Sequence, residues 1–153
     1  MKYFTNKKND IEGYMKNIQK LENILNPDTH NFMLKDSFHD SVLNELTVLN
    51  NINIEETTNS EINEVSVVAK VTHWDDRKYE LLWENVNLYS VDFDITRNRI
   101  VETNQILYER GLDQWSHDEL TLTANGNLRH EIFLFSQTTI TIESTNFIIN
   151  SLS

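Results

Sequence analysis

Four of the five histidines stand beside acidic residues, in the segments Phe38-His39-Asp40, His73-Trp74-Asp75-Asp76, Ser116-His117-Asp118-Glu119 and Arg129-His130-Glu131. A histidine and a carboxylate together can bind a divalent metal ion or act as an acid–base pair. Adjacent residues on a strand point to opposite faces of the sheet, so a His-Asp dipeptide in β-structure cannot chelate through both side chains. The spacings also lack the i, i+4 histidine pair of the zinc-protease helix. We therefore expect no metal site in this chain.

The residue types and their spacing do not support a nucleophilic mechanism either. The segment from Asp36 to Ser41 contains aspartate, serine and histidine, but residues this close in sequence cannot form a hydrogen-bonded relay with an oxyanion hole. The chain has no cysteine, which excludes disulfides, thiolate metal sites and a cysteine nucleophile. Its three glycines are far apart, so P-loop and dinucleotide-binding folds are excluded as well. We expect no catalytic residue and no cofactor.

The charge of the chain is strongly negative and unevenly distributed. Its 24 acidic and 13 basic residues give a net charge of -11. Residues 1–35 hold six lysines and four acids, whereas residues 36–153 hold seven basic and twenty acidic residues. Such a surface repels nucleic-acid phosphates and anionic lipids, so we expect neither a nucleic acid nor a membrane as partner. It suits a basic protein partner, or serves solubility alone.

The length of the chain is typical of one globular domain over residues 1–153. No apolar segment follows the basic start, as it would in a secretory signal. No apolar run approaches the ~20 residues of a membrane span. The sequence therefore predicts a cytoplasmic protein with a single domain.

Residues 9–26 are predicted to form one amphipathic helix. Apolar side chains recur every three or four residues through this segment and share one face. Asn9 or Asp10 can cap the start of the helix. Pro27 is expected to end it, because the residue before a proline avoids the helical region. We expect the helix to pack against the domain's own sheet.

From about residue 41 the apolar residues alternate with a period of two, which predicts antiparallel strands over residues 41–150. The predicted strands are 41–49, 64–72, 78–84, 86–94, 99–103, 120–124, 127–135, 138–143 and 147–149. Residues 106–112 fit a strand or a short helix, and the acidic segment 50–64 is predicted to be an exposed hairpin loop. The expected fold is α+β: the N-terminal helix packs on a mainly antiparallel sheet of about seven or eight strands, strongly curved or shaped as a half-barrel.

The sharpest local signal is Asn125-Gly126, which lies between two of these strands. Asn-Gly supplies the positive φ angles that a type I′ turn requires at both of its central positions. The sequence therefore predicts a hairpin with a two-residue loop at this point.

The three tryptophans fall into two groups. Trp83 belongs to an alternating apolar pattern and is expected in the core. Trp74 and Trp115 stand in acidic surroundings, where each is either partly buried at a strand end or an exposed binding anchor. If they are anchors, the residues expected to contact a protein partner combine each tryptophan with its nearby carboxylates: Trp74, Asp75, Asp76, Trp115, Asp118 and Glu119.

Three further features occur together: the segment Phe38-His39-Asp40-Ser41 before a strand, the segment Leu88–Phe93, and a hairpin over 128–135 followed by an Ile-rich strand. This arrangement resembles small uncharacterised bacterial proteins in which a hydrophobic-His-Asp-Ser or -Cys segment leads into the first strand. Some of them look like immunity proteins encoded beside polymorphic toxins. The resemblance spans residues 36–150 and carries no catalytic residue with it.

The resemblance and the charge together suggest a non-enzymatic protein-binding domain, an immunity-type inhibitor of a cognate bacterial toxin that is basic where the two touch. The alternative is a small-molecule-binding β-sheet domain, which a deep apolar pocket with a few polar groups would favour. A hydrolase that uses one histidine–carboxylate pair is the third possibility.

Overall fold

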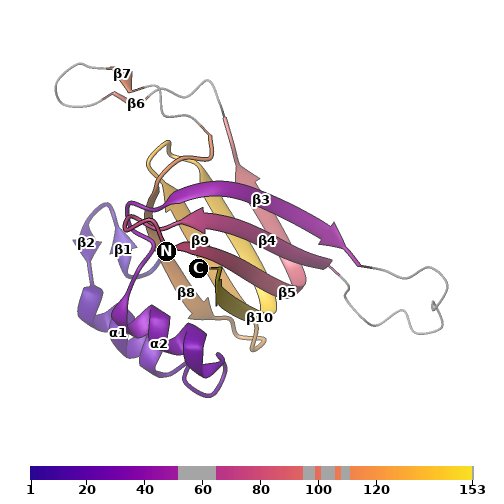
Figure 1. The fold of residues 1–153 in the computed structure, drawn as a ribbon. Coiled ribbons are helices and arrows are strands. Elements are labelled where there is room, and N and C mark those ends of the chain that lie inside the picture. Colours follow the sequence, from indigo (N-terminus) through magenta and orange to yellow (C-terminus); the bar gives the residue numbers. More distant parts are fainter. Residues whose placement is uncertain (52–64, 95–98, 101–105, 108–110, 153) are drawn as a thin grey trace.

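The computed structural model describes residues 1–51, 65–94, 99–100, 106–107 and 111–152 (Figure 1). The predicted loop over 50–64 and the predicted strand over 99–103 lie mostly outside these residues, as does most of the segment 106–112. Two short strands there, β6 (Arg99–Ile100) and β7 (Ile106–Leu107), pair antiparallel. The described residues form an α+β fold with a mainly antiparallel sheet, which confirms the predicted fold class.

Two helices precede the sheet: α1 (Ile11–Gln19) and α2 (Pro27–Lys35). The side chains of Asp10 and Asn26 cap them, each by accepting a hydrogen bond from a backbone N–H three residues further on. A single helix over 9–26 was predicted, and this is wrong: α1 ends at Gln19, residues 20–24 form turns, and Pro27 begins a second helix. The first helical position needs no N–H donor, and the proline ring already holds the helical φ.

The larger strands form one six-stranded antiparallel sheet in the order β3-β4-β5-β10-β9-β8, and β1 and β2 form a separate hairpin. Their bounds are β1 (Phe4–Thr5), β2 (Lys8–Asn9), β3 (Val42–Asn50), β4 (Val65–Thr72), β5 (Lys78–Asp92), β8 (Trp115–Leu122), β9 (Leu128–Leu134) and β10 (Thr139–Ser151). β5 and β10 each run through two predicted strands, so the sheet has fewer and longer strands than the sequence suggested.

The two edge strands of the sheet meet at one end. The N–H of Leu43 in β3 donates to the carbonyl of Asp113 at 3.0 Å, and the N–H of Trp115 in β8 donates to the carbonyl of Ser41 at 2.8 Å. These bonds flank an isolated antiparallel bridge. The sheet as a whole is open, so this junction fixes only the first residues of β3 and β8 against each other.

The predicted hairpin joins β8 and β9, but through a longer turn than expected. The N–H of Thr123 donates to the carbonyl of Asn127 at 2.8 Å, which leaves three residues in the loop. Gly126 has a φ of +83, whereas Asn125 is not among the described residues with positive φ. The predicted type I′ turn is therefore wrong, and a three-residue loop with glycine in the left-handed position takes its place.

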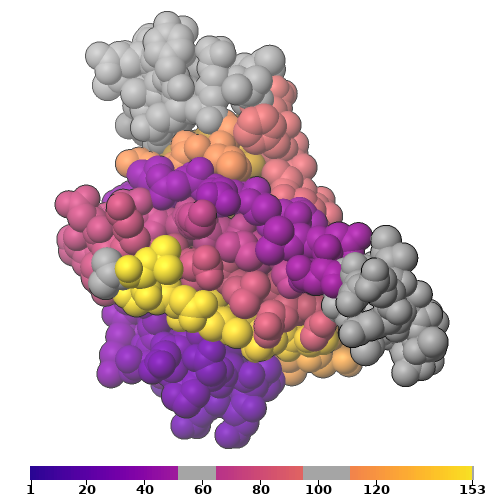
Figure 2. All heavy atoms as spheres, turned by 45° about the vertical axis from the view of Figure 1, so that its right-hand side comes forward, coloured from indigo at the N-terminus to yellow at the C-terminus, as the bar shows by residue number. Residues whose placement is uncertain are grey.

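The hydrophobic core lies between the helices and the sheet. α1 contacts β8 and α2 contacts β10, where the Ile149 N–H donates to the hydroxyl of Thr29 at 2.9 Å. Trp83 is fully buried in this core, as predicted. Figure 2 shows the end of β10 (yellow) lying between the helices (indigo) and the strands of residues 65–92 (magenta). Within the described residues, no helix is long and apolar enough to span a bilayer.

Candidate functional site

Three segments that the sequence singles out meet where β3 and β8 join: residues 36–40, residues 73–77 and residues 114–118. We call this region the loop end. The N–H of Asp40 donates to the carbonyl of Trp115 at 2.9 Å, and Nε2 of His73 lies 3.0 Å from the carbonyl of Ser37. Segments far apart in the sequence thus form one continuous surface.

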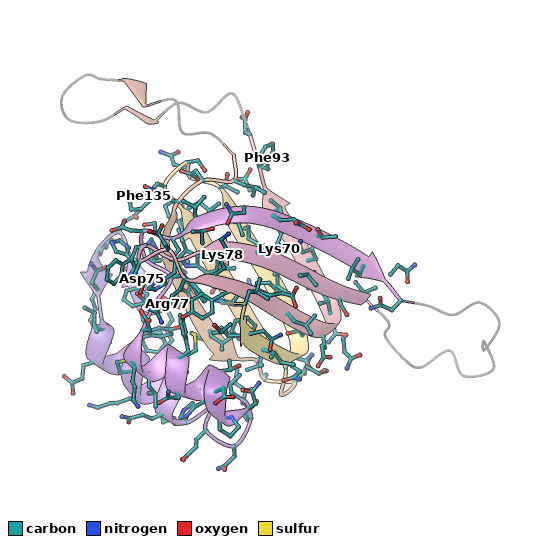
Figure 3. All side chains as sticks on the ribbon, in the orientation of Figure 1. Lys70, Asp75, Arg77, Lys78, Phe93 and Phe135 are labelled. Carbon is teal, nitrogen blue, oxygen red and sulfur yellow. The ribbon has the colours of Figure 1, made fainter. Side chains whose placement is uncertain are left out.

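His73 is the centre of an ion network in the loop end. Its side chain is fully buried, with Nδ1 2.7 Å from a carboxylate oxygen of Asp75 and Nε2 3.2 Å from one of Asp36. Arg77 closes the network by donating to Asp75 at 2.7 Å and to Asp36 at 2.8 Å. Figure 3 shows Asp75 and Arg77 beside each other. Both ring nitrogens of His73 face carboxylate oxygens, and Nε2 also faces the carbonyl of Ser37.

The network lowers the pKa of both carboxyl groups. Desolvation acts to raise the pKa of Asp75, but hydrogen bonds from His73 and Arg77 outweigh it and hold this pKa at about 2. Desolvation likewise opposes a lowered pKa at Asp36, where the hydrogen bond from Arg77 is the largest favourable cause. Both carboxylates are therefore charged at neutral pH, and they hold the turn over 73–77 in place.

Trp74 lies outside this network and is 66% exposed, although its ring is only 5.4 Å from that of His73. Asp76 is also exposed and adopts a φ of +69, and its N–H donates to the His73 carbonyl at 3.0 Å. Of the first predicted partner-binding group, Trp74 and Asp76 are thus at the surface. Asp75 is exposed as well, but its carboxylate already contacts His73 and Arg77.

The second predicted partner-binding group, formed by Trp115, Asp118 and Glu119, points into the protein. Trp115 is fully buried and donates its Nε1–H to Asp118 at 2.9 Å. The other carboxylate oxygen of Asp118 lies 2.9 Å from Nε2 of His130, whose Nδ1 accepts from Nε1 of Trp83 at 3.2 Å. Trp115 is therefore not an exposed binding anchor. Its side chain is part of the core at the point where β8 joins β3.

Glu119 is fully buried as well, and it holds the start of the chain against β8. Its two carboxylate oxygens accept from the N–H groups of Lys2, Tyr3 and Phe4, each at 2.6 Å. A carboxylate enclosed in this way is not available to a partner. Because its donors lie more than 110 residues away in sequence, no local pattern points to this role.

A cleft of about 540 Å³ opens in the loop end between the N-terminal segment and β8. Its apolar lining comes from Phe4, Ile11, Tyr14, Met15, Met33 and Phe38. His39 and His117 also line it and meet at Ser116: Nδ1 of His39 contacts the carbonyl, and Nδ1 of His117 lies 3.0 Å from the hydroxyl. Desolvation lowers the pKa of His117, against the opposite effect of Asp118.

The structure thus brings the histidine–acid segments together, but His73 and His130 contact carboxylates of residues that are not next to them in sequence. His130 is opposite Leu120 in the β8–β9 ladder, which places Asp118 diagonally across on the same face. The register of the predicted hairpin is the signal that could have found this pair. His73 reaches Asp75 because the segment is a turn rather than a strand.

Two buried polar side chains near the junction of β3 and β8 have no hydrogen-bond partner in the described part of the chain. They are the hydroxyl of Ser41 and the carboxylate of Asp113, a residue that is only 8% exposed. A buried carboxylate without a partner destabilises the folded state. The sequence does not predict this unpaired carboxylate, because the burial of Asp113 depends on how the two edge strands meet.

No known family model matches this chain, and no curated protein is significantly similar to it. Among the residues that the structure describes, no three His, Asp or Glu side chains are grouped so that they could hold a metal ion. The function of the loop end must therefore be inferred from its own geometry.

Proposed function

We propose that this chain is a non-enzymatic protein-binding domain, an immunity-type inhibitor that neutralises a cognate bacterial toxin in the cytoplasm by binding it through the loop end. The observation that carries the proposal is Trp74, which is 66% exposed on a turn held by ion pairs. Tryptophan is enriched among the residues that dominate the binding energy of protein interfaces.

The rigidity of the turn strengthens the case for Trp74. His73 and Arg77 flank the tight turn, and both are bound to Asp75 and to Asp36 in the neighbouring segment. Association therefore requires little ordering of this backbone. A preorganised aromatic side chain retains more of its burial energy as affinity.

Charge supports a basic partner. The chain has a net charge of -11, and Asp76 is exposed beside Trp74. Many toxins are nucleases with basic clefts, so an acidic inhibitor would be steered toward them and held in register. In this arrangement the tryptophan supplies the desolvated contact and the carboxylate supplies the long-range attraction.

The test is to co-express the protein with the product of an adjacent toxin-like gene and to measure growth. We expect the wild type to restore growth, Trp74→Ala to lose most of the protection, and Asp76→Lys to reduce it. Asp75 is left unchanged, since its loss would disturb the turn itself. Matched controls are Leu122→Ala, an exposed apolar residue at the far end of β8, and Glu22→Lys, an exposed acid in the segment between the helices.

Full protection by Trp74→Ala and Asp76→Lys would contradict the proposed surface. Absence of protection by the wild type would remove that toxin as the partner, and absence of any toxin-like neighbouring gene would count against the immunity role. Added salt should slow association, because at ~0.15 M the Debye length is already about 8 Å.

A second candidate function, binding of a small molecule, is favoured by the cleft of about 540 Å³ beside the N-terminal segment. Its volume and its mixed lining are typical of small-molecule sites. The two functions are distinguished by where a partner binds: Trp74 is not among the residues that line the cleft.

A further inference from the structure

We propose that the cleft in the loop end binds a small organic cation, an apolar molecule that carries one protonated amine. The site is separate from Trp74, so this inference does not depend on the proposed toxin-binding function.

The size and the walls of the cleft suit an aromatic or short aliphatic ligand. Its volume of about 540 Å³ falls within the ~300–1,000 Å³ range of small-molecule sites. The rings of Phe4 and Tyr14 meet edge to face at 5.2 Å, and the buried Phe38 also contributes to the lining. Burial of an apolar ligand against these side chains is favourable at roughly 25 cal/mol per Å².

The charge of the lining selects for a cation. The lining contains the carboxylates of Asp118 and Asp36, of which Asp36 is already paired with Arg77, and among the described residues that form it there is no lysine or arginine. A ligand carboxylate would meet the like charge of Asp118, whereas an ammonium group would meet an opposite one. The faces of the aromatic rings Phe4 and Tyr14 add a further attraction for a cation.

Asp118 is the group that would hold the amine, because its neighbour His117 points to the other face of β8 and lies against Phe133. Each oxygen of Asp118 accepts one internal hydrogen bond, from Trp115 or His130, and a carboxylate oxygen can accept a second. The Asp118 side chain keeps 11% of its surface exposed.

Three matched probes test the proposal in the full-length protein: 2-phenylethylamine, 2-phenylethanol and 3-phenylpropionate. Binding is followed at pH 8 by the NMR signals of the Met15 methyl and the His117 ring. We expect saturable shifts with the amine, binding about tenfold weaker with the alcohol, which corresponds to ~1.4 kcal/mol, and no saturable binding with the carboxylate.

Charge variants at the mouth of the cleft provide the second arm. Ile11 lines the cleft and is 63% exposed, so a polar residue there leaves the core intact. We expect Ile11→Lys to weaken amine binding several-fold and Ile11→Glu to strengthen it. The control is Leu122→Lys, which adds the same charge at the far end of β8 and should change nothing. Met15→Trp should fill the cleft and abolish binding, with the folded state checked by circular dichroism.

Equal or tighter binding of the carboxylate would overturn the proposal. So would shifts that never saturate, or amine binding that is unchanged in both Met15→Trp and Ile11→Lys. None of these outcomes would bear on whether Trp74→Ala loses protection against a toxin, so the two proposals fail separately.

Discussion

Single residues in the loop end divide into those that hold the structure and those left free to bind. His73, Asp75 and Arg77 form one closed network, while Trp74 and Asp76 alternate with them in sequence and face solvent. Neighbours in the chain thus have opposite roles. The sequence groups all of these acids together as one candidate interface, and only the turn geometry separates them.

The two tryptophans show why burial could not be predicted residue by residue. Trp74 and Trp115 both stand among acids, yet one is 66% exposed and the other fully buried. Trp115 faces inward because β8 joins β3 at that point, and this junction depends on residues 70 or more positions apart. Trp74 sits on a tight turn, where no second strand covers it.

The ion network predicts a specific pH dependence of stability. The pKa of Asp75 is about 2 in the folded protein, below the ~3.9 of an unfolded aspartate. A lowered carboxyl pKa stabilises the folded state above the unfolded value, and this contribution disappears as the pH falls from about 4 to about 2. Asp75→Asn should therefore lower the free energy of unfolding at pH 6 and flatten its fall between pH 4 and pH 2.

Urea denaturation over this pH range measures the effect, with Asp76→Asn as the control. Asp76 is exposed and next in sequence, and asparagine tolerates its positive φ. Parallel curves for wild type and Asp75→Asn would show that the network does not contribute to stability.

Asp113 leads to a second prediction at the residue scale. Its carboxylate is buried and has no hydrogen-bond partner within the described residues. Asp113→Leu, which keeps the branching of the side chain but replaces its two oxygens by methyl groups, should raise the free energy of unfolding by about 1–2 kcal/mol, because it removes the desolvation penalty. Thermal unfolding measures this. A clear loss of stability would mean that the carboxylate has a partner that the hydrogen-bond pattern does not show.

At the scale of elements, period and turn chemistry predicted most strands but misplaced several ends. Alternation located β4 and β9 closely, because each has one buried face. It also found β3, in which Leu43 alone is buried, but of β8 (Trp115–Leu122) it found only the last part, as residues 120–124. It split β5 and β10 in two, since each continues through a polar interruption: Asn85, with a φ of 51, in β5 and the bulge at Glu143–Ser144 in β10. The helix prediction failed in the opposite way, because α1 already ends at Gln19. Pro27 begins α2, since a proline suits the first position of a helix.

The hairpin between β8 and β9 yields a prediction that depends on its turn type. Gly126 has a φ of +83 with open space around it, so Gly126→Val meets backbone strain alone and should destabilise the protein by about 1–3 kcal/mol. Asn125→Ala should have a much smaller effect, because Asn125 is not in the left-handed region. Chemical denaturation compares the two variants. Equal losses would indicate the two-residue type I′ turn instead.

At the scale of the whole molecule, the fold class followed from the sequence but the site did not. One helical pattern and many short alternating segments are enough to predict α+β with an antiparallel sheet. The loop end forms only because the β3–β8 junction and the β4–β5 turn bring three distant segments together. The sequence alone gives the net negative charge. It does not predict which acidic side chains face solvent, because that depends on the register of the sheet.

The affinity of the purified protein for a toxin partner, measured by isothermal titration for wild type and for Trp74→Ala, tests the central claim most directly. If the loop end is the binding surface, the wild type binds the toxin. Trp74→Ala then raises Kd by about 30-fold, a loss of ~2 kcal/mol of binding free energy, and leaves the melting temperature unchanged. Leu122→Ala should bind as the wild type does. Equal affinity of Trp74→Ala and wild type would contradict the claim.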